Sequence, residues 1–180
     1  MMRNLMYSVL LAATAVAATP FLLPDTKLVG TGLRDNVTPI EVVSFPSWEC
    51  PSCSPEEQYI LEELQDKTRI RDKNALATIM GNIKQESNFT PDICEGGARV
   101  PYSECHSGGY GIIQWTSIGR YDNLGRFCDR FDCDPSTLEG QTRYMINEST
   151  FQRVLPEFEG GGQTVRQYMV PAFYWLGWGY

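Results

Sequence analysis

Histidine is almost absent from this 180-residue chain, which contains only His106. An amidase or peptidase of the cysteine–histidine class needs a reactive cysteine opposite a histidine. In this chain the histidine would have to be His106, and this assignment is excluded if the adjacent Cys105 is in a disulfide. A zinc knuckle needs about four cysteine or histidine ligands in two close pairs, so we expect no metal and no cofactor. Basic residues are outnumbered 15 to 22 by acidic ones, giving a net charge of -7, which argues against nucleic acid as a partner.

Strand signals are also nearly absent, apart from a candidate edge strand at Thr38 to Phe45. The chain is 42% hydrophobic and can bury one core. Hydrophobic periodicity and capping residues predict helices over 54–67, 72–87, 120–131 and 135–151, then a last helix, or a helix pair around Pro171, over 164–175. We therefore expect a mainly α domain with little or no sheet.

Residues 1–23 are typical of a targeting segment. Arg3 provides a positive charge, residues 5–18 carry none, and Ala15-Val16-Ala17 is a small-x-small site that a signal peptidase cuts. The alternative is a weak membrane anchor, because residues 5–23 are uncharged and nearly long enough to span a bilayer. Pro20 and the many alanines and threonines favour a signal peptide. Either interpretation places the remainder outside the cytoplasm.

Residues 24–53 form a linker rich in proline and glycine, and residues 54–180 form the compact domain. Six cysteines fit an exported protein with disulfides. Proximity favours the pairs Cys94–Cys105 and Cys128–Cys133, which would staple two loops. Cys50 and Cys53 would then form a tight disulfide, a redox pair or half of a metal site.

A carboxyl group falls on the apolar stripe of the helix over 72–87. Leu76, Ile79 and Ile83 share one face, and Glu86 lies three residues beyond Ile83. Contact with an apolar surface and the negative end of the helix dipole both raise a carboxyl pKa. Glu86 is therefore a candidate general acid.

Two blocks in this region resemble the phage tail lysozyme family. The first is Gly81-Asn82-Ile83-Lys84-Gln85-Glu86-Ser87, and the second is Gly109-Tyr110-Gly111-Ile112-Ile113-Gln114-Trp115. The family belongs to the lysozyme-like superfamily, with goose-type lysozymes and soluble lytic transglycosylases as wider relatives. The resemblance covers about residues 54 to 180 and is strongest over 75 to 125.

The resemblance implies a helical, lysozyme-like domain that cleaves the β-1,4 bond between N-acetylmuramic acid and N-acetylglucosamine in peptidoglycan. Glu86 matches the catalytic acid of the family, and Gly111 and Gln114 match the glycine and glutamine that line its sugar groove. Tyr110 and Trp115 are then aromatics that pack on a sugar. The candidates for a second carboxylate are Asp92, Glu95 and Glu104.

Several alternatives stay open on the sequence alone. Tyr110 and Trp115 could instead be core aromatics, and Gln114 could satisfy backbone amides in a turn. The protein could be a hydrolase, a lytic transglycosylase that gives 1,6-anhydro products, or a noncatalytic wall-binding or virion module. We expect it in the periplasm, outside the cell or on a virion with other virion proteins, and less so on a membrane through residues 5–23.

Overall fold

The computed structural model describes residues 47–106 and 108–177. The predicted signal peptide, the candidate strand and most of the predicted linker lie outside this range. The described residues contain the helices α1 (Pro55–Lys67), α2 (Lys73–Ser87), α3 (Ile118–Phe131), α4 (Leu138–Asn147), α5 (Ser149–Glu159) and α6 (Val165–Leu176), with a 3-10 turn η1 (Tyr102–Glu104). Extended pairing in them is limited to two isolated bridges, so the mainly α prediction is confirmed.

No helix in the described part of the chain has the length and apolarity to cross a membrane.

The first two helices begin where the sequence predicts, because each carries its own cap. Ser54 and Glu57 form a capping box at the start of α1, in which each side chain bonds the backbone N–H of the other residue. Asp72 accepts a hydrogen bond from the backbone N–H of Asn74 at the start of α2. Asn88, in a left-handed conformation, ends α2.

The prediction of one helix over 135–151 is wrong. The structure has two helices there, α4 and α5, separated at Glu148, and α5 continues to Glu159. Glu148 has φ -66° and ψ 144°, which is extended backbone that interrupts the helical hydrogen bonds. No glycine or proline marks this position, so local sequence gave no sign of the break. At the last segment the structure has a single helix, α6, that passes through Pro171.

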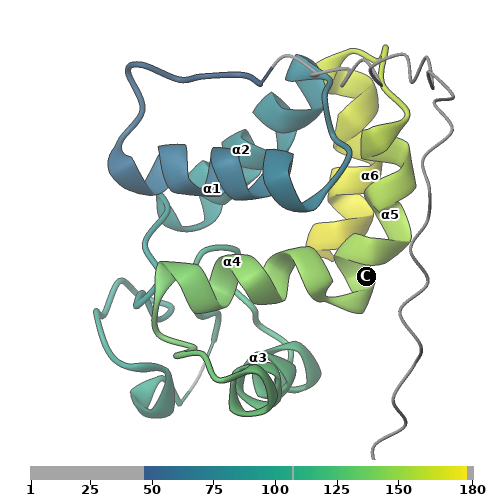
Figure 1. The fold of residues 1–180 in the computed structure, drawn as a ribbon. Coiled ribbons are helices and arrows are strands. Elements are labelled where there is room, and N and C mark those ends of the chain that lie inside the picture. The colour runs from purple at the N-terminus through teal and green to yellow at the C-terminus, as the bar shows by residue number, and fades with distance from the viewer. Residues whose placement is uncertain (1–46, 107, 178–180) are drawn as a thin grey trace, which may run out of the picture. The chain divides into compact units, whose positions relative to one another are not determined.

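Helix α4 occupies the centre of the fold. It packs against α1, α3 and α5, while α6 packs against α2 and α5. Figure 1 shows α4 crossing between α1 and α3, with α5 and α6 closing one end. The core that results is fully enclosed at Ile60, Ile79 and Met145.

Glu148 explains why the chain turns between α4 and α5. Its carboxylate is buried and accepts hydrogen bonds from the indole N–H groups of Trp115 at 3.3 Å and Trp175 at 2.9 Å. The guanidinium of Arg120 bonds it through Nε at 3.2 Å and Nη2 at 2.5 Å. A buried carboxylate is tolerated only when it is paired in this way. One side chain thus joins α3, α6 and the segment before α3.

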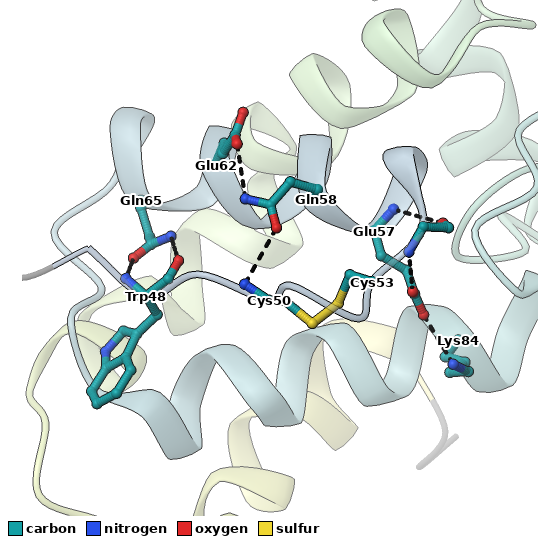
Figure 2. The surroundings of a disulfide bond; sticks show 9 residues. Trp48, Cys50, Cys53, Glu57, Gln58, Glu62, Gln65 and Lys84 are labelled. Atoms are coloured by element: carbon teal, nitrogen blue, oxygen red, sulfur yellow. Dashed lines mark hydrogen bonds and ion pairs between the residues drawn. A yellow bond between two sulfur atoms is a disulfide. The ribbon is translucent and has the colours of Figure 1, made fainter.

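Residues 47–53, predicted as the end of the linker, lie against α1 (Figure 2). The backbone N–H of Trp48 donates to Gln65 Oε1 at 2.6 Å, and the Gln65 amide donates back to the Trp48 carbonyl at 2.9 Å. The Trp48 indole donates to the Arg71 carbonyl at 2.8 Å. Glu57, in the capping box, also pairs with Lys84 of α2. This short segment is therefore part of the folded unit.

All six cysteines are paired, as Cys50–Cys53, Cys94–Cys105 and Cys128–Cys133. The two pairs that proximity favoured are confirmed, and Cys50–Cys53 is the tight disulfide among its three alternatives. Because Cys105 is oxidised, a nucleophilic Cys105 beside His106 is excluded in this state.

We expect Glu148→Gln to lower the free energy of unfolding by about 3–5 kcal/mol, because it leaves the partly buried Arg120 charge without its counter-ion. Urea unfolding followed by circular dichroism measures the loss. Glu139→Gln is the matched control, since the Glu139–Arg143 pair is exposed and its removal should change stability by no more than about 0.5 kcal/mol. Equal stability of the two variants would contradict this role for Glu148.

Candidate active site

Glu86 lies in the last turn of α2, at the end of the apolar stripe. Leu76, Ile79 and Ile83 are buried as predicted, and Glu86 is half-buried. The side chain of Glu86 therefore projects from the rim of the core rather than from an open helix face. This is a position where a carboxyl group is partly desolvated.

Ser87 fastens the end of α2 to the glycine-rich turn. Its buried hydroxyl donates to the carbonyl of Ile112 at 2.8 Å, across 25 residues of sequence. Because Glu86 is the preceding residue, this bond fixes the acid-bearing helix end relative to the turn. The two motifs that the sequence pairs are thus in direct contact in the fold.

The turn over 108–115 is built from residues with unusual backbone angles. Gly111 has φ +76° and Gln114 has φ 51°. Backbone N–H groups of Gly111 and Trp115 donate to the carbonyls of Ile93 at 2.9 Å and Tyr110 at 3.0 Å, respectively. A tight turn with a left-handed residue at position 111 favours glycine there.

Gln141 of α4 holds this turn from behind. Its side chain is fully buried, and its Oε1 accepts from the backbone N–H of Ile112 at 2.9 Å. Its amide nitrogen donates to the carbonyls of Pro91 at 2.6 Å and Pro135 at 2.7 Å. The side-chain amide of Gln141 thereby joins three segments: the chain after α2, the turn, and the chain just before α4. The sequence gave no signal for this residue, because its partners are distant along the chain.

The three candidate second carboxylates differ in their surroundings. Glu95 lies beside the turn: its Oε2 accepts from the backbone N–H of Gly109 at 3.1 Å, and its own N–H donates to the Gly109 carbonyl at 2.8 Å. Asp92 forms an ion pair with Arg99 at 2.5 Å. Glu104 is exposed in η1. The disulfide Cys94–Cys105 closes the loop that carries Glu95 and Glu104.

The motif aromatics face the core. Tyr110 and Trp115 are both 0% exposed, so neither ring presents a face that a sugar could reach in this structure. The Tyr110 hydroxyl donates to the Val100 carbonyl, and the Trp115 indole to Glu148. Burial raises the pKa of Tyr110 and raises the pKa of Tyr102 to about 12, so both phenols are neutral near pH 7.

Gln114 is half-buried, and its amide nitrogen donates to the carbonyls of Gly111 at 3.0 Å and Ile93 at 3.4 Å. These bonds satisfy backbone groups in the turn. They also fix the orientation of the side chain. Its amide oxygen accepts no hydrogen bond from the described residues.

The surface is hollowed on both sides of Thr116, two residues beyond Gln114. One hollow, of about 450 Å³, lies between η1 and the start of α3 and includes Tyr102, His106 and Gly108. The other, of about 330 Å³, lies between α3, α5 and the end of α6. Both hollows include Thr116, so they lie on neighbouring parts of the surface next to the turn.

A helical domain in which a helix ending in an acid is bonded to a glycine-rich turn fits a lysozyme-like enzyme. In comparison with known families, residues 57–169 match the phage tail lysozyme family. The chain belongs to this family, which bears out the resemblance in its two motifs. In general terms, the function of this family is lysozyme-like degradation of peptidoglycan. A virion or exported location is consistent with this function. No curated protein and no solved structure matches the chain.

Gly111→Ala should destabilise the protein by about 1–3 kcal/mol, because alanine is strained at φ +76°. Its added Cβ would also lie 2.3 Å from Oε1 of Gln141, a side chain that is held by three hydrogen bonds, one to Oε1 and two from Nε2. Chemical unfolding measures the change. Gly119→Ala is the control: the added Cβ meets nothing within 4 Å in α3, so stability should hold or rise by up to about 1 kcal/mol. If both variants unfold like the parent, Gly111 does not constrain the turn.

Proposed function

We propose that the protein is a peptidoglycan glycosidase that cleaves the β-1,4 bond between N-acetylmuramic acid and N-acetylglucosamine, with Glu86 as the general acid. The observation that carries the proposal is the hydrogen bond between Ser87 and Ile112, which holds the Glu86 helix end against the turn containing Gly111 and Gln114. Membership of the phage tail lysozyme family supports the same chemistry.

In this reaction a proton must reach the leaving oxygen as positive charge develops on the sugar ring. Glu86, half-buried at the helix end, delivers that proton. As the general acid, Glu86 must carry its proton when the substrate binds.

Substrate contacts in this proposal come from Gln114 and the backbone at Gly111. The Gln114 amide oxygen accepts a hydrogen bond from a sugar hydroxyl or acetamido N–H. Tyr110 and Trp115 hold the turn from inside the core and do not touch the sugar.

We propose Glu95 as the second carboxylate, because it is the candidate whose carboxylate bonds the glycine-rich turn directly. It would stabilise the positively charged transition state or orient a water molecule. Asp92 is paired with Arg99 and is less suited to that role.

Glu86→Gln keeps the size of the side chain but removes its acidic proton. We expect release of soluble muropeptides from purified cell walls to fall by about 10²–10⁴-fold. The variant should melt at the temperature of the parent, which separates lost chemistry from lost folding. Glu139→Gln, with its exposed carboxylate, should retain parental activity. A Glu86→Gln protein that clears walls as fast as the parent would overturn the proposal.

Mass spectrometry of the products identifies the reaction type. Reducing ends indicate hydrolysis, whereas 1,6-anhydro ends indicate a lytic transglycosylase with the same acid. A parent protein that binds walls and releases neither product would be a noncatalytic module.

Glu95→Gln tests the second carboxylate with its loop intact, because the glutamine oxygen can still accept from the backbone N–H of Gly109. We expect a rate loss of about tenfold to hundredfold. Asp92→Asn and Glu104→Gln serve as matched controls and should lose less. A larger loss in either control would assign the role elsewhere.

A further inference from the structure

The hollow of about 330 Å³ beyond Thr116 differs in charge from the rest of the molecule. It is lined by Arg120 of α3 and Arg153 of α5, and by no carboxylate side chain. The whole chain has a net charge of -7, whereas the charged side chains that line this hollow are both positive. The size of the hollow suits a small group such as a short peptide segment.

The two arginines play different parts. Arg120 is committed to the buried Glu148, which lies beneath the hollow, and its Nη1 also donates to the Leu176 carbonyl at 3.4 Å. Arg153 is exposed and has no ion pair within the described residues. The pair beneath is internally neutralised, so Arg153 supplies the net positive charge of this surface.

Polar and aromatic groups complete the lining. Thr150 Oγ1 is buried and has no hydrogen-bond partner among the described residues. A buried polar atom without a partner is uncommon in folded proteins. Tyr174 is 60% exposed at the edge of the hollow and offers a phenol ring to an occupant. Together with the cation, these groups suit a small ligand with a carboxylate.

Thr116, in the lining of this hollow, follows Gln114 of the glycine-rich turn by two residues, so the hollow lies next to that turn. The glycan itself supplies no anion, since N-acetylglucosamine is neutral and the carboxyl of muramic acid is joined to the peptide as an amide. The carboxylates of peptidoglycan belong to the peptides that branch from its glycan. An anion that reaches this hollow while a glycan lies along the turn therefore comes from such a peptide.

We propose that this hollow binds the peptide stem of peptidoglycan, with Arg153 pairing with a stem carboxylate. The proposal rests on the function proposed above, because it takes the glycan to lie along the turn. Arg153 then acts as a specificity residue that favours glycan carrying free stem carboxylates over glycan whose stem carboxylates are amidated.

The direct test is calorimetric binding of a purified disaccharide–tetrapeptide and of the same compound with its carboxylates amidated. In this ligand muramic acid is the reducing end, so its one β-1,4 bond starts at C1 of N-acetylglucosamine. The enzyme is proposed to cut the bond that starts at C1 of muramic acid, so the intact protein can be used. We expect Arg153→Gln to weaken binding of the free acid about tenfold and to leave binding of the amidated compound unchanged. Arg166→Gln, an exposed arginine on α6, is the control and should match the parent with both ligands.

Absence of parental binding, or an equal effect of Arg153→Gln on both ligands, would overturn the proposal. Digestion gives a separate reading. On intact walls Arg153→Gln should raise KM with kcat unchanged, and on walls whose stem carboxylates have been amidated it should equal the parent. A parent that cleaves neither substrate but binds the free acid through Arg153 would refute the glycosidase and retain the binding site.

Discussion

The buried carboxylate of Glu148 is the interaction on which the arrangement of this fold depends. Two indoles and one guanidinium converge on it from α3, α6 and the end of the glycine-rich turn. Burying a charge is costly, and the cost is offset only when every partner is in place. If one of these helices shifted on its own, the buried carboxylate would lose a hydrogen-bond partner, and the cost of burying its charge would no longer be offset. The break between α4 and α5 is the geometric consequence, since the backbone must turn to direct this side chain inward.

The residues that position the candidate site are different from those proposed to act on the substrate. Ser87 joins the acid-bearing helix end to the turn, and Gln141 supports the turn from α4. The motif aromatics fill the core beneath. This division leaves Glu86, Gln114 and the Glu95 loop at the surface, while the residues that hold them are inaccessible to substrate. Positioning by a rigid interior is what a reaction with a short proton-transfer distance requires.

The sequence predicted the features that depend on neighbouring residues, such as helix starts and short motifs. It did not predict those that depend on contacts between distant parts of the chain. Ser54, Asp72 and Thr164 cap their helices within three residues, so α1, α2 and α6 begin close to where the sequence predicts. The two motif blocks carry the family in a short stretch. Glu148 and Gln141 act across tens of residues through tertiary contacts, and nothing in their neighbourhood distinguishes them from ordinary polar helix residues. The burial of Tyr110 likewise depends on contacts with Tyr102 and Tyr121, and that of Trp115 on a contact with Tyr144 of α4. No spacing rule predicts these contacts.

The disulfide Cys94–Cys105 makes the chemistry of the surrounding compartment a condition of assembly. It closes the loop that carries Glu95, which bonds Gly109 of the turn, so this loop is covalently closed only after two thiols have been oxidised. In a reducing cytosol that loop would lack its covalent closure, and hydrogen bonds such as those between Glu95 and Gly109 would hold it alone. Transfer to an oxidising compartment would allow the Cys94–Cys105 disulfide to form. The redox state of the compartment would therefore determine when the loop that carries Glu95 is covalently closed.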